Sequence, residues 1–194
     1  MGRATALRFA RPGAHVFINY HADDAAADET AAAVKSMGAN PHVIKADVRT
    51  VEGVRSILRS VQTVTTRLDV VVHCAVDTSL PGPALALDPI AFADAVQANG
   101  SAVLALTQSA LPLMSAGASV IFVTSRGSHA VVPGYVAVGA PKALGEILIR
   151  YLAVEPAPSG IRANCVMGSA MDTDAIRAAL PPVRPRRVCS RPRR

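Results

Sequence analysis

Tyr135, Lys142 and Ser125 are the residues whose types and spacing suit proton-transfer chemistry. Tyr135 lies seven residues before Lys142, two turns of an α-helix, so the two side chains can share one helix face. A hydroxyl held there can stabilise developing negative charge, and a nearby ammonium group makes that hydroxyl more acidic. Val138, four residues before Lys142, has no proton to give. Each of the three also has a structural alternative: a packing tyrosine, a solvated lysine and a serine that caps a strand.

The positions of these residues depend on strands and helices that alternate along the chain. Short apolar runs predict strands at residues 15–20, 41–48, 68–73, 119–124 and 161–166. Helical spacing predicts helices at residues 24–37, 50–66, 89–115 and 139–154. Apolar strands that are each followed by a helix form a parallel sheet with right-handed crossovers. The sequence therefore predicts an α/β fold with a doubly wound, Rossmann-like parallel sheet, which would bind nucleotides at the carboxyl ends of its strands.

Composition and charge indicate one domain followed by a different kind of tail. A chain of 194 residues is long enough to bury a core, and with 51% hydrophobic but only 4% aromatic residues that core should be aliphatic. We expect residues 1–180 to form an incomplete nucleotide-binding domain. Residues 181–194 carry six of the 20 basic residues and should be a disordered Pro/Arg tail. Without the tail, 14 basic residues balance 14 acidic ones, so nucleic-acid binding is not expected.

Cysteines and apolar runs restrict the compartment. The three cysteines are far apart and odd in number, which argues against a disulfide framework and against a metal site. No apolar run reaches the roughly 18 residues that span a bilayer, and no signal peptide is recognisable. We therefore expect a cytoplasmic protein with no metal and no membrane partner.

Residues 2 to about 180 resemble the short-chain dehydrogenase/reductase family. Asn99 matches the asparagine of the family's central helix, and Ser125 matches its catalytic serine. Residues 68–75 resemble the strand that ends in Asn-Asn-Ala-Gly. The resemblance implies cofactor contacts from these residues: Gly2, Asn19, Asp47, Val48, Ala75, Lys142 and Thr173. It also implies that Tyr135, Lys142, Ser125 and Asn99 are catalytic.

The spacing from Tyr135 to Lys142 resembles one branch of this family, the enoyl-ACP reductase III enzymes. That branch implies transfer of a hydride from NADPH to the β-carbon of a 2-enoyl thioester, as in fatty-acid biosynthesis. Tyr135 would then stabilise the enolate oxygen, Lys142 would hold the ribose hydroxyls, and Ser125 would orient substrate or tyrosine. The substrate would be a thioester of acyl carrier protein or coenzyme A. Members of the family are commonly homo-oligomers, so the resemblance implies a homo-oligomer here.

The end of the first predicted strand bears on the choice of cofactor. Members that prefer NAD place an acidic residue there to bind the ribose 2′-hydroxyl. Here that place holds Asn19, Tyr20 and His21, and the acidic Asp23 and Asp24 come later. Because the strand end has no acidic residue, nothing there would repel a 2′-phosphate. The sequence therefore favours NADP(H).

The sequence also departs from the family at both ends. Gly2 resembles the last glycine of the phosphate-binding loop, so we expect the first strand and the rest of that loop to be absent. In the family this strand lies at the sheet centre, and its absence would leave two strands with unpaired inner edges. The last strand is also expected to be missing. Two alternatives therefore stay open. One is a 3-oxoacyl-ACP or other carbonyl reductase, which would require a tyrosine at position 138. The other is an inactive truncated fragment.

Overall fold

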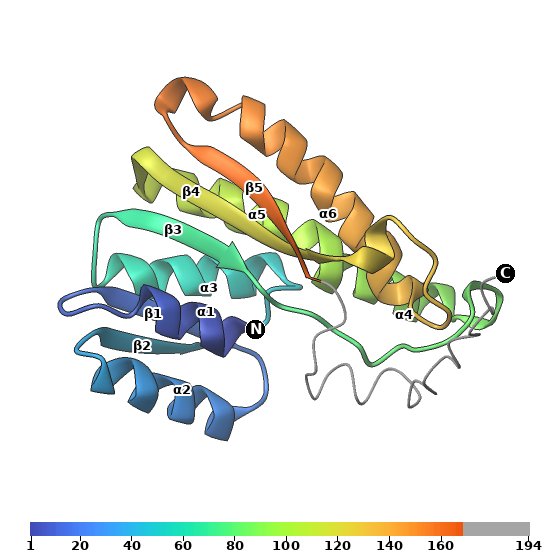
Figure 1. Cartoon of the computed structure of the whole chain (residues 1–194), viewed down its shortest axis with the longest axis horizontal. Helices are drawn as coiled ribbons and strands as arrows, with labels where there is room; N and C mark the ends of the chain where they lie inside the picture. Colours follow the sequence, from blue (N-terminus) through green and yellow to red (C-terminus); the bar gives the residue numbers. More distant parts are fainter. Residues whose placement is uncertain (169–194) are drawn as a thin grey trace, which may run out of the picture.

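The computed structural model describes residues 1–168, and they form alternating strands and helices (Figure 1). The strands are β1 (His15–Tyr20), β2 (Asn40–Lys45), β3 (Leu68–His73), β4 (Met114–Ser125) and β5 (Arg162–Gly168). The helices are α1 (Gly2–Phe9), α2 (Asp24–Ser36), α3 (Val51–Gln62), α4 (Pro89–Val96), α5 (Ala102–Ala110) and α6 (Val136–Val154). The predicted α/β fold is confirmed.

The strands form two parallel sheets instead of one. β1 pairs with β2, while β3, β4 and β5 pair in that order, and all the pairings are parallel. β1 and β3 are each the last strand of their sheet, so each keeps one edge without a strand neighbour. The sequence predicts such a pair of open edges, and the structure has it between β1 and β3.

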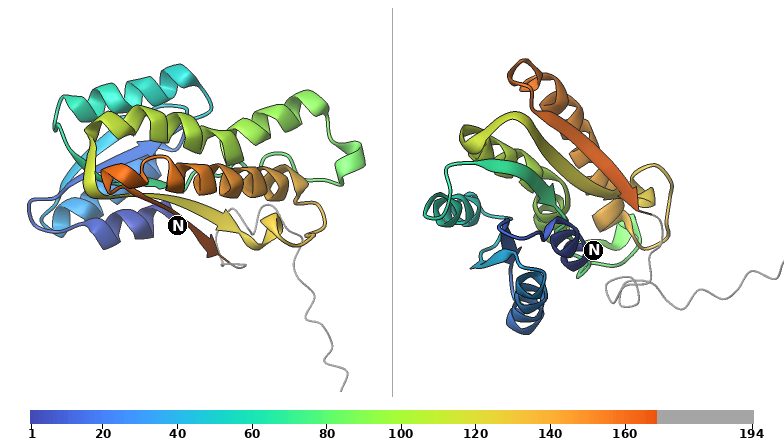
Figure 2. Two further views of the ribbon diagram at one scale, coloured as in Figure 1. Left: turned by 90° about the horizontal axis from the view of Figure 1, so that it is seen from above. Right: turned by 60° about the vertical axis from the view of Figure 1, so that its left-hand side comes forward.

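Helices cover the two faces of the sheets unequally. α1 and α2 pack beside β1 and β2, whereas α3, α5 and α6 lie on the opposite side against β3, β4 and β5 (Figure 2). Accordingly, the core has a small cluster under α1 and α2 and a much larger one under the other helices. Both clusters are mainly aliphatic, as the composition predicts, and Phe122 is the large aromatic residue fully buried in the larger one.

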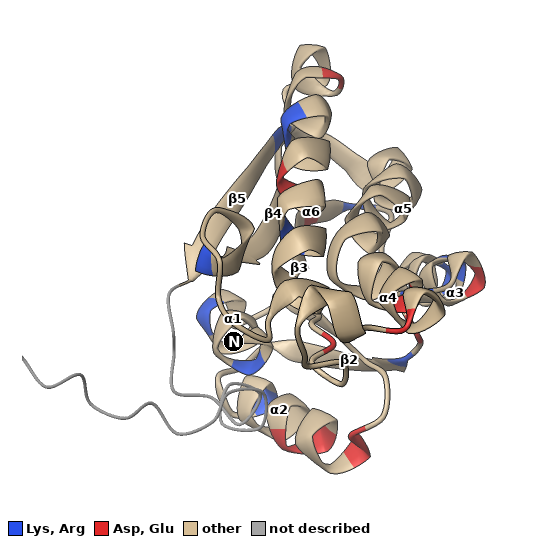
Figure 3. Ribbon diagram, turned by 90° about the vertical axis from the view of Figure 1, so that its right-hand side faces the viewer, with Lys and Arg blue, Asp and Glu red and all other residues tan. Residues whose placement is uncertain are grey.

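Charged residues lie mainly on helices and loops (Figure 3). Among the five strands, β1 and β4 contain no charged residue, and the others contain one each: Lys45, Asp69 and Arg162. Charged residues are therefore sparse on the strands, with at most one on each.

The predicted helix at residues 89–115 is interrupted and ends early. α4 passes through a π-helical turn at Gln97–Ser101 into α5, and β4 already begins at Met114. Together the segment Pro89–Leu113 is long and apolar enough to cross a membrane by length and composition alone, which the sequence prediction did not anticipate. However, α5 packs against α3, α6, β3 and β4, and a core helix passes the same test.

Candidate active site

Lys142 lies in α6 as a buried amine with few partners. Its side chain is 4% exposed, and its Nζ donates one long hydrogen bond of 3.4 Å to the carbonyl oxygen of Ala75, just beyond β3. The Nζ also stands 4.5 Å above the centre of the Phe122 ring. Burial lowers the pKa of Lys142 to about 8. An ammonium group with three N–H bonds and a single long acceptor can still donate to hydroxyl oxygens of a bound molecule.

The backbone around Phe122 explains why Lys142 can stand there. Gly145 lies on the same helix, and a Cβ at that position would come within 2.3 Å of Phe122 Cζ. The glycine thus lets α6 approach the ring that supports the lysine. Close packing of this kind gives the amine a defined position because the ring below it cannot move away.

Tyr135 and Ser125 are brought together by Gly127. Tyr135 is the residue that precedes α6, and its ring packs so closely on Gly127 that a Cβ there would lie 2.6 Å from Tyr135 Cδ1. The N–H of Gly127 donates to Ser125 Oγ at 3.2 Å. Both residues therefore lie at one corner, between the end of β4 and the start of α6. Val138, by contrast, is 4% exposed and part of the core.

Asn99 is fully buried in the π-helical turn, and its side chain is saturated with hydrogen bonds. Its Oδ1 accepts from the N–H of Asp77 at 2.7 Å, and its Nδ2 donates to the carbonyls of Asp77 at 2.9 Å and Ala137 at 3.1 Å. These contacts join the segment after β3 to the first turn of α6. In this structure Asn99 is placed to position its neighbours, and its catalytic role stays a prediction.

Pro141 explains why Ala137 needs that bond. Pro141 lies beyond the first turn of α6, which begins at Val136, where a helical residue would normally donate its N–H. A proline has no N–H to give to the carbonyl four residues earlier, which is that of Ala137. Asn99 Nδ2 donates to this carbonyl instead, so a side chain 38 residues away replaces the missing helical hydrogen bond.

Glu146 forms a polar cluster that the sequence prediction missed. Its buried carboxylate accepts hydrogen bonds from the hydroxyls of Thr124 and Ser128 and pairs with His129 Nε2 at 2.6 Å. Burial by itself would raise the pKa of Glu146, but the bonds from Ser128, Thr124 and His129 hold it below its usual value. The cluster fixes the turn Arg126–Ser128, which directly follows Ser125.

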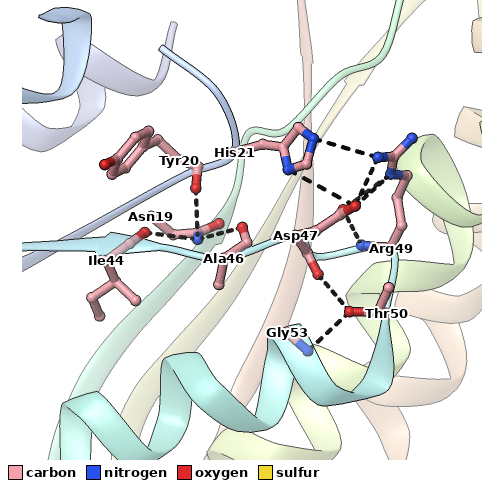
Figure 4. A network of polar contacts seen from close by, with 9 residues as sticks. All are labelled: Asn19, Tyr20, His21, Ile44, Ala46, Asp47, Arg49, Thr50 and Gly53. Carbon is pink, nitrogen blue, oxygen red and sulfur yellow. Dashed lines mark hydrogen bonds and ion pairs between the residues drawn. The ribbon is translucent and has the colours of Figure 1, made fainter. Parts of the chain in front are cut away.

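A second cluster lies at the carboxyl ends of β1 and β2 (Figure 4). Asp47 accepts hydrogen bonds from the backbone N–H of Arg49 at 2.9 Å and from its guanidinium group, and His21 Nδ1 lies 3.8 Å from the same carboxylate. The Arg49 guanidinium is the main reason why the pKa of Asp47 is lowered. Val48, the next residue, is half-buried and packs against the larger core cluster. Arg49 was not among the predicted site residues. Its position two residues after Asp47 is a sequence signal that could have indicated this ion pair.

Asn19 is used to join strands. Its Nδ2 donates to the carbonyls of Ile44 at 3.1 Å and Ala46 at 3.0 Å, and lies 3.5 Å from that of Tyr20. Gly2 begins α1 beside Cys74, close to the carboxyl end of β3. The predicted residues therefore gather at the same edge of the two sheets, in two groups: one around Asp47 and Asn19, the other around Lys142, Tyr135 and Ser125. Thr173 lies outside the described residues.

The described residues fit a nicotinamide cofactor at this edge. The buried amine of Lys142 has N–H bonds to spare for ribose hydroxyls, and Asp47 and Val48 lie just beyond the carboxyl end of β2. His73, at the end of β3, is buried with both ring nitrogens unpartnered, and burial lowers its pKa to about 3, so its imidazole is neutral. In residues 1–168 no group of three or more histidine, cysteine or acidic side chains could hold a metal ion.

Comparison with known proteins decides the family. The model of the family described as enoyl-(acyl carrier protein) reductase matches residues 1–185. The chain belongs to this family of short-chain dehydrogenases/reductases. It is 34% identical over 176 residues to the 1-cyclohexenylcarbonyl-CoA reductase of Streptomyces collinus, covering 91% of this chain and 62% of that protein. It is also 32% identical over 134 residues to FabI of a Synechocystis species, which is named as an NADH-dependent enoyl-(acyl carrier protein) reductase. This match covers 68% of this chain and 52% of that one.

Solved structures agree with the assignment to the short-chain dehydrogenase/reductase family. A promiscuous reductase, LugOII, which catalyses keto-reduction in lugdunomycin biosynthesis, superposes with a TM-score of 0.80 at 29% identity, covering 87% of this chain and 69% of its own. A dehydrogenase/reductase of Sinorhizobium meliloti gives a TM-score of 0.82 at 27% identity, with coverages of 89% and 68%. The chain thus spans about three fifths of its Streptomyces relative and two thirds of these structures.

Proposed function

We propose that this short-chain dehydrogenase/reductase is an enoyl-thioester reductase that uses NADPH. The observation that carries the proposal is the arrangement of α6: Lys142 is a buried amine with donors to spare, Tyr135 stands at the start of the same helix, and Val138 is packed into the core. The only hydroxyl of the helix start that can serve as donor is therefore that of Tyr135. Because the chain spans 62% of its Streptomyces relative, activity, substrate and partner all belong to this proposal.

The residues have distinct tasks in such a reaction. When bound, the nicotinamide would supply a hydride to the β-carbon of the enoyl thioester. Negative charge then grows on the thioester oxygen, and the hydroxyl of Tyr135 stabilises it by donating a hydrogen bond. Lys142 binds the ribose hydroxyls with its spare N–H bonds. Ser125, held on the same corner through Gly127, orients the substrate or the tyrosine.

The preference for NADPH is supported by the second cluster. Two acids follow β1: Asp23 caps α2 by accepting a hydrogen bond from the N–H of Ala26, and Asp24 is bound to Tyr20 and Lys45. His21 and Arg49 stand at the strand ends instead, and their nitrogens lie 3.5 Å apart. A 2′-phosphate would meet basic groups there, whereas an adenosine 2′-hydroxyl would find no free carboxylate. The FabI relatives are named for NADH, so the preference needs a direct measurement with both cofactors.

The proposed substrate is a 2-enoyl thioester of coenzyme A or acyl carrier protein, by similarity to the two named reductases. The second candidate function is carbonyl reduction, which the similarity to a keto-reducing enzyme favours. A homo-oligomer is also part of the proposal, because α6 exposes an apolar stripe to solvent at Leu144, Ile147, Tyr151 and Val154.

The test is turnover of a 2-enoyl-CoA and of a 3-oxoacyl-CoA, measured by NADPH and NADH oxidation. Tyr135→Phe should lower kcat for the enoyl substrate about 100-fold with little change in KM, since the hydroxyl acts mainly in the transition state. Tyr151→Phe is the matched control, because Tyr151 lies on the same helix but is 66% exposed. Faster turnover of the 3-oxoacyl substrate, unaffected by Tyr135→Phe, would establish the second candidate. Turnover of neither substrate would leave the inactive-fragment alternative.

A further inference from the structure

Two histidines lie side by side on the β1–β2 sheet. The register pairs His15 with Asn40 and Phe17 with His42, so the two histidines are diagonal neighbours on one face of adjacent strands. His15 Nδ1 lies 2.9 Å from His42 Nε2, and the ring centroids are 5.1 Å apart. The two nitrogens therefore lie between the rings and face each other. Their contact crosses from β1 to β2, which is the paired side of β1 and not its open edge.

The pair combines a restrained ring with an accessible one. Phe17 stacks on the imidazole of His42, with centroids 4.8 Å apart and planes inclined by 24°, and this contact restrains the ring. His15 is exposed to solvent. His15 begins β1 and His42 is the third residue of β2, so the pair lies away from the carboxyl ends of the strands. It is therefore separate from the candidate active site, which gathers at those carboxyl ends.

The charges around the pair favour neutral rings. Among residues 1–168, the ion pairs of histidine belong to His21 and His129, and no third histidine, cysteine or acidic side chain joins His15 and His42. Burial and the neighbouring His15 lower the pKa of His42, so its ring is neutral at neutral pH. A neutral imidazole carries the lone pair that binds a metal ion. Nitrogen ligands without a carboxylate suit Cu²⁺, Ni²⁺ and Zn²⁺ better than Mg²⁺ or Ca²⁺.

We propose that His15 Nδ1 and His42 Nε2 bind one divalent transition-metal ion, with water in its other positions. Two metal–nitrogen bonds of about 2.0–2.1 Å at a tetrahedral angle set the nitrogens about 3.3 Å apart, so rings that are now 2.9 Å apart must separate by only ~0.4 Å. The proton between the nitrogens passes through water to the other nitrogen of its own ring, and both rings stay neutral ligands. The ion would join β1 to β2, whose sheet has only these two strands.

Calorimetric titration of the full chain with Ni²⁺ tests the site, because imidazole is a preferred ligand of Ni²⁺. His15→Gln and His42→Gln should each weaken Ni²⁺ binding at least tenfold, since one ion needs both rings. His21→Gln and His129→Gln are matched controls on exposed histidines and should bind Ni²⁺ as the wild type does. Full-strength binding by His15→Gln, or an equal loss in His21→Gln, would overturn the proposal.

Two further measurements show whether both rings bind the same ion. The electron paramagnetic resonance spectrum of one equivalent of Cu²⁺ should show coupling to two imidazole nitrogens, and His15→Gln should reduce this to one. Ni²⁺ should raise Tm and slow hydrogen exchange of the β1 and β2 amides in the wild type, but not in His15→Gln. Mg²⁺ should have neither effect. Coupling to a single nitrogen, or a rise in Tm without slower exchange in β1 and β2, would contradict a shared ion.

Discussion

At the scale of single residues, Lys142 shows how burial sets the chemistry of the site. An ordinary lysine keeps its proton beyond pH 10, but the walls around Lys142 lower its pKa to about 8. The amine therefore remains charged at neutral pH, and it is within reach of losing its proton in mild alkali. Burying a charged amine with few acceptors destabilises the folded state. A bound ribose can offset this penalty because its hydroxyl oxygens accept hydrogen bonds from the amine.

The first prediction is that the penalty of burying the charged Lys142 amine makes the stability depend on pH. Between pH 8 and 10.5 the unfolded chain holds the Lys142 proton and the folded chain does not, so the free energy of unfolding rises with pH. Relative to Lys142→Met, the wild type should gain up to about 3 kcal/mol over this range. Urea unfolding of both proteins at pH 8 and pH 10 measures this difference in the free energy of unfolding. Comparison with the variant removes the contribution of the other titrating groups. Identical pH dependence in both proteins would show that Lys142 is not buried in its charged form.

At the scale of elements, α6 is held at its start by side chains from distant parts of the chain. Asn99 replaces the hydrogen bond that Pro141 cannot make, and Glu146 secures the turn after Ser125. These two contacts determine where the helix begins relative to β3 and β4. They therefore also determine where Tyr135 and Ser125 stand.

The second prediction concerns Asn99 and Pro141. Asn99→Ala should destabilise the protein by about 1–3 kcal/mol, because buried backbone groups of Asp77 and Ala137 lose their partners. Pro141→Ala restores an N–H that can donate to Ala137, so Asn99→Ala should cost less in that background. A double-mutant cycle by urea unfolding measures the coupling. Additive effects would mean that the two residues do not share this carbonyl.

The third prediction concerns Glu146 and acid. Its pKa is lowered in the folded state, so the stability that it contributes is present above the usual value of 4.5 and is lost as pH falls further. Wild type should lose stability below pH 4.5 more steeply than Glu146→Gln, which has no charge to neutralise. Glu29→Gln is a control on an exposed glutamate. Parallel acid unfolding curves for wild type and Glu146→Gln would rule out a stabilising carboxylate.

At the scale of the whole molecule, the division into two sheets should divide the stability as well. The small cluster of Ala10, Val16, Val34 and Ala39 lies under the β1–β2 pair, which contributes one buried residue, Ile44, to the large core. β3, β4 and β5 contribute most of the strand residues of that large core. A sheet of two strands has little stability of its own. The part that contains Asp47 and the carboxyl ends of β1 and β2 is therefore the less stable one.

The last prediction follows from this asymmetry. Amides of β1 and β2 should exchange with solvent faster than those of β4, because the smaller unit can open while the larger remains folded. Hydrogen exchange followed by mass spectrometry resolves the two regions. Equal protection across all five strands would show that the two sheets unfold together.

Local sequence determined the elements that depend on local periodicity. β1 and β3 occupy residues 15–20 and 68–73 as predicted, because their apolar runs and the following helices suffice to define them. The spacing of Tyr135 and Lys142 also indicated the enoyl-reductase branch of the family, because this separation can be read directly from the sequence. The start of α6 was placed three residues late, since the preceding loop has no strong capping signal.

Tertiary structure alone decided the contacts that make the site. Asn99 reaches Ala137 across 38 residues, and Glu146 reaches Thr124 across 22, distances that no local pattern encodes. Likewise, the burial of Val138 and the pKa of Lys142 depend on packing around α6. The open edges of β1 and β3 likewise depend on how the two sheets are arranged. These features arise from which surfaces meet, and this is set by the packing of the whole chain and not by the order of neighbouring residues.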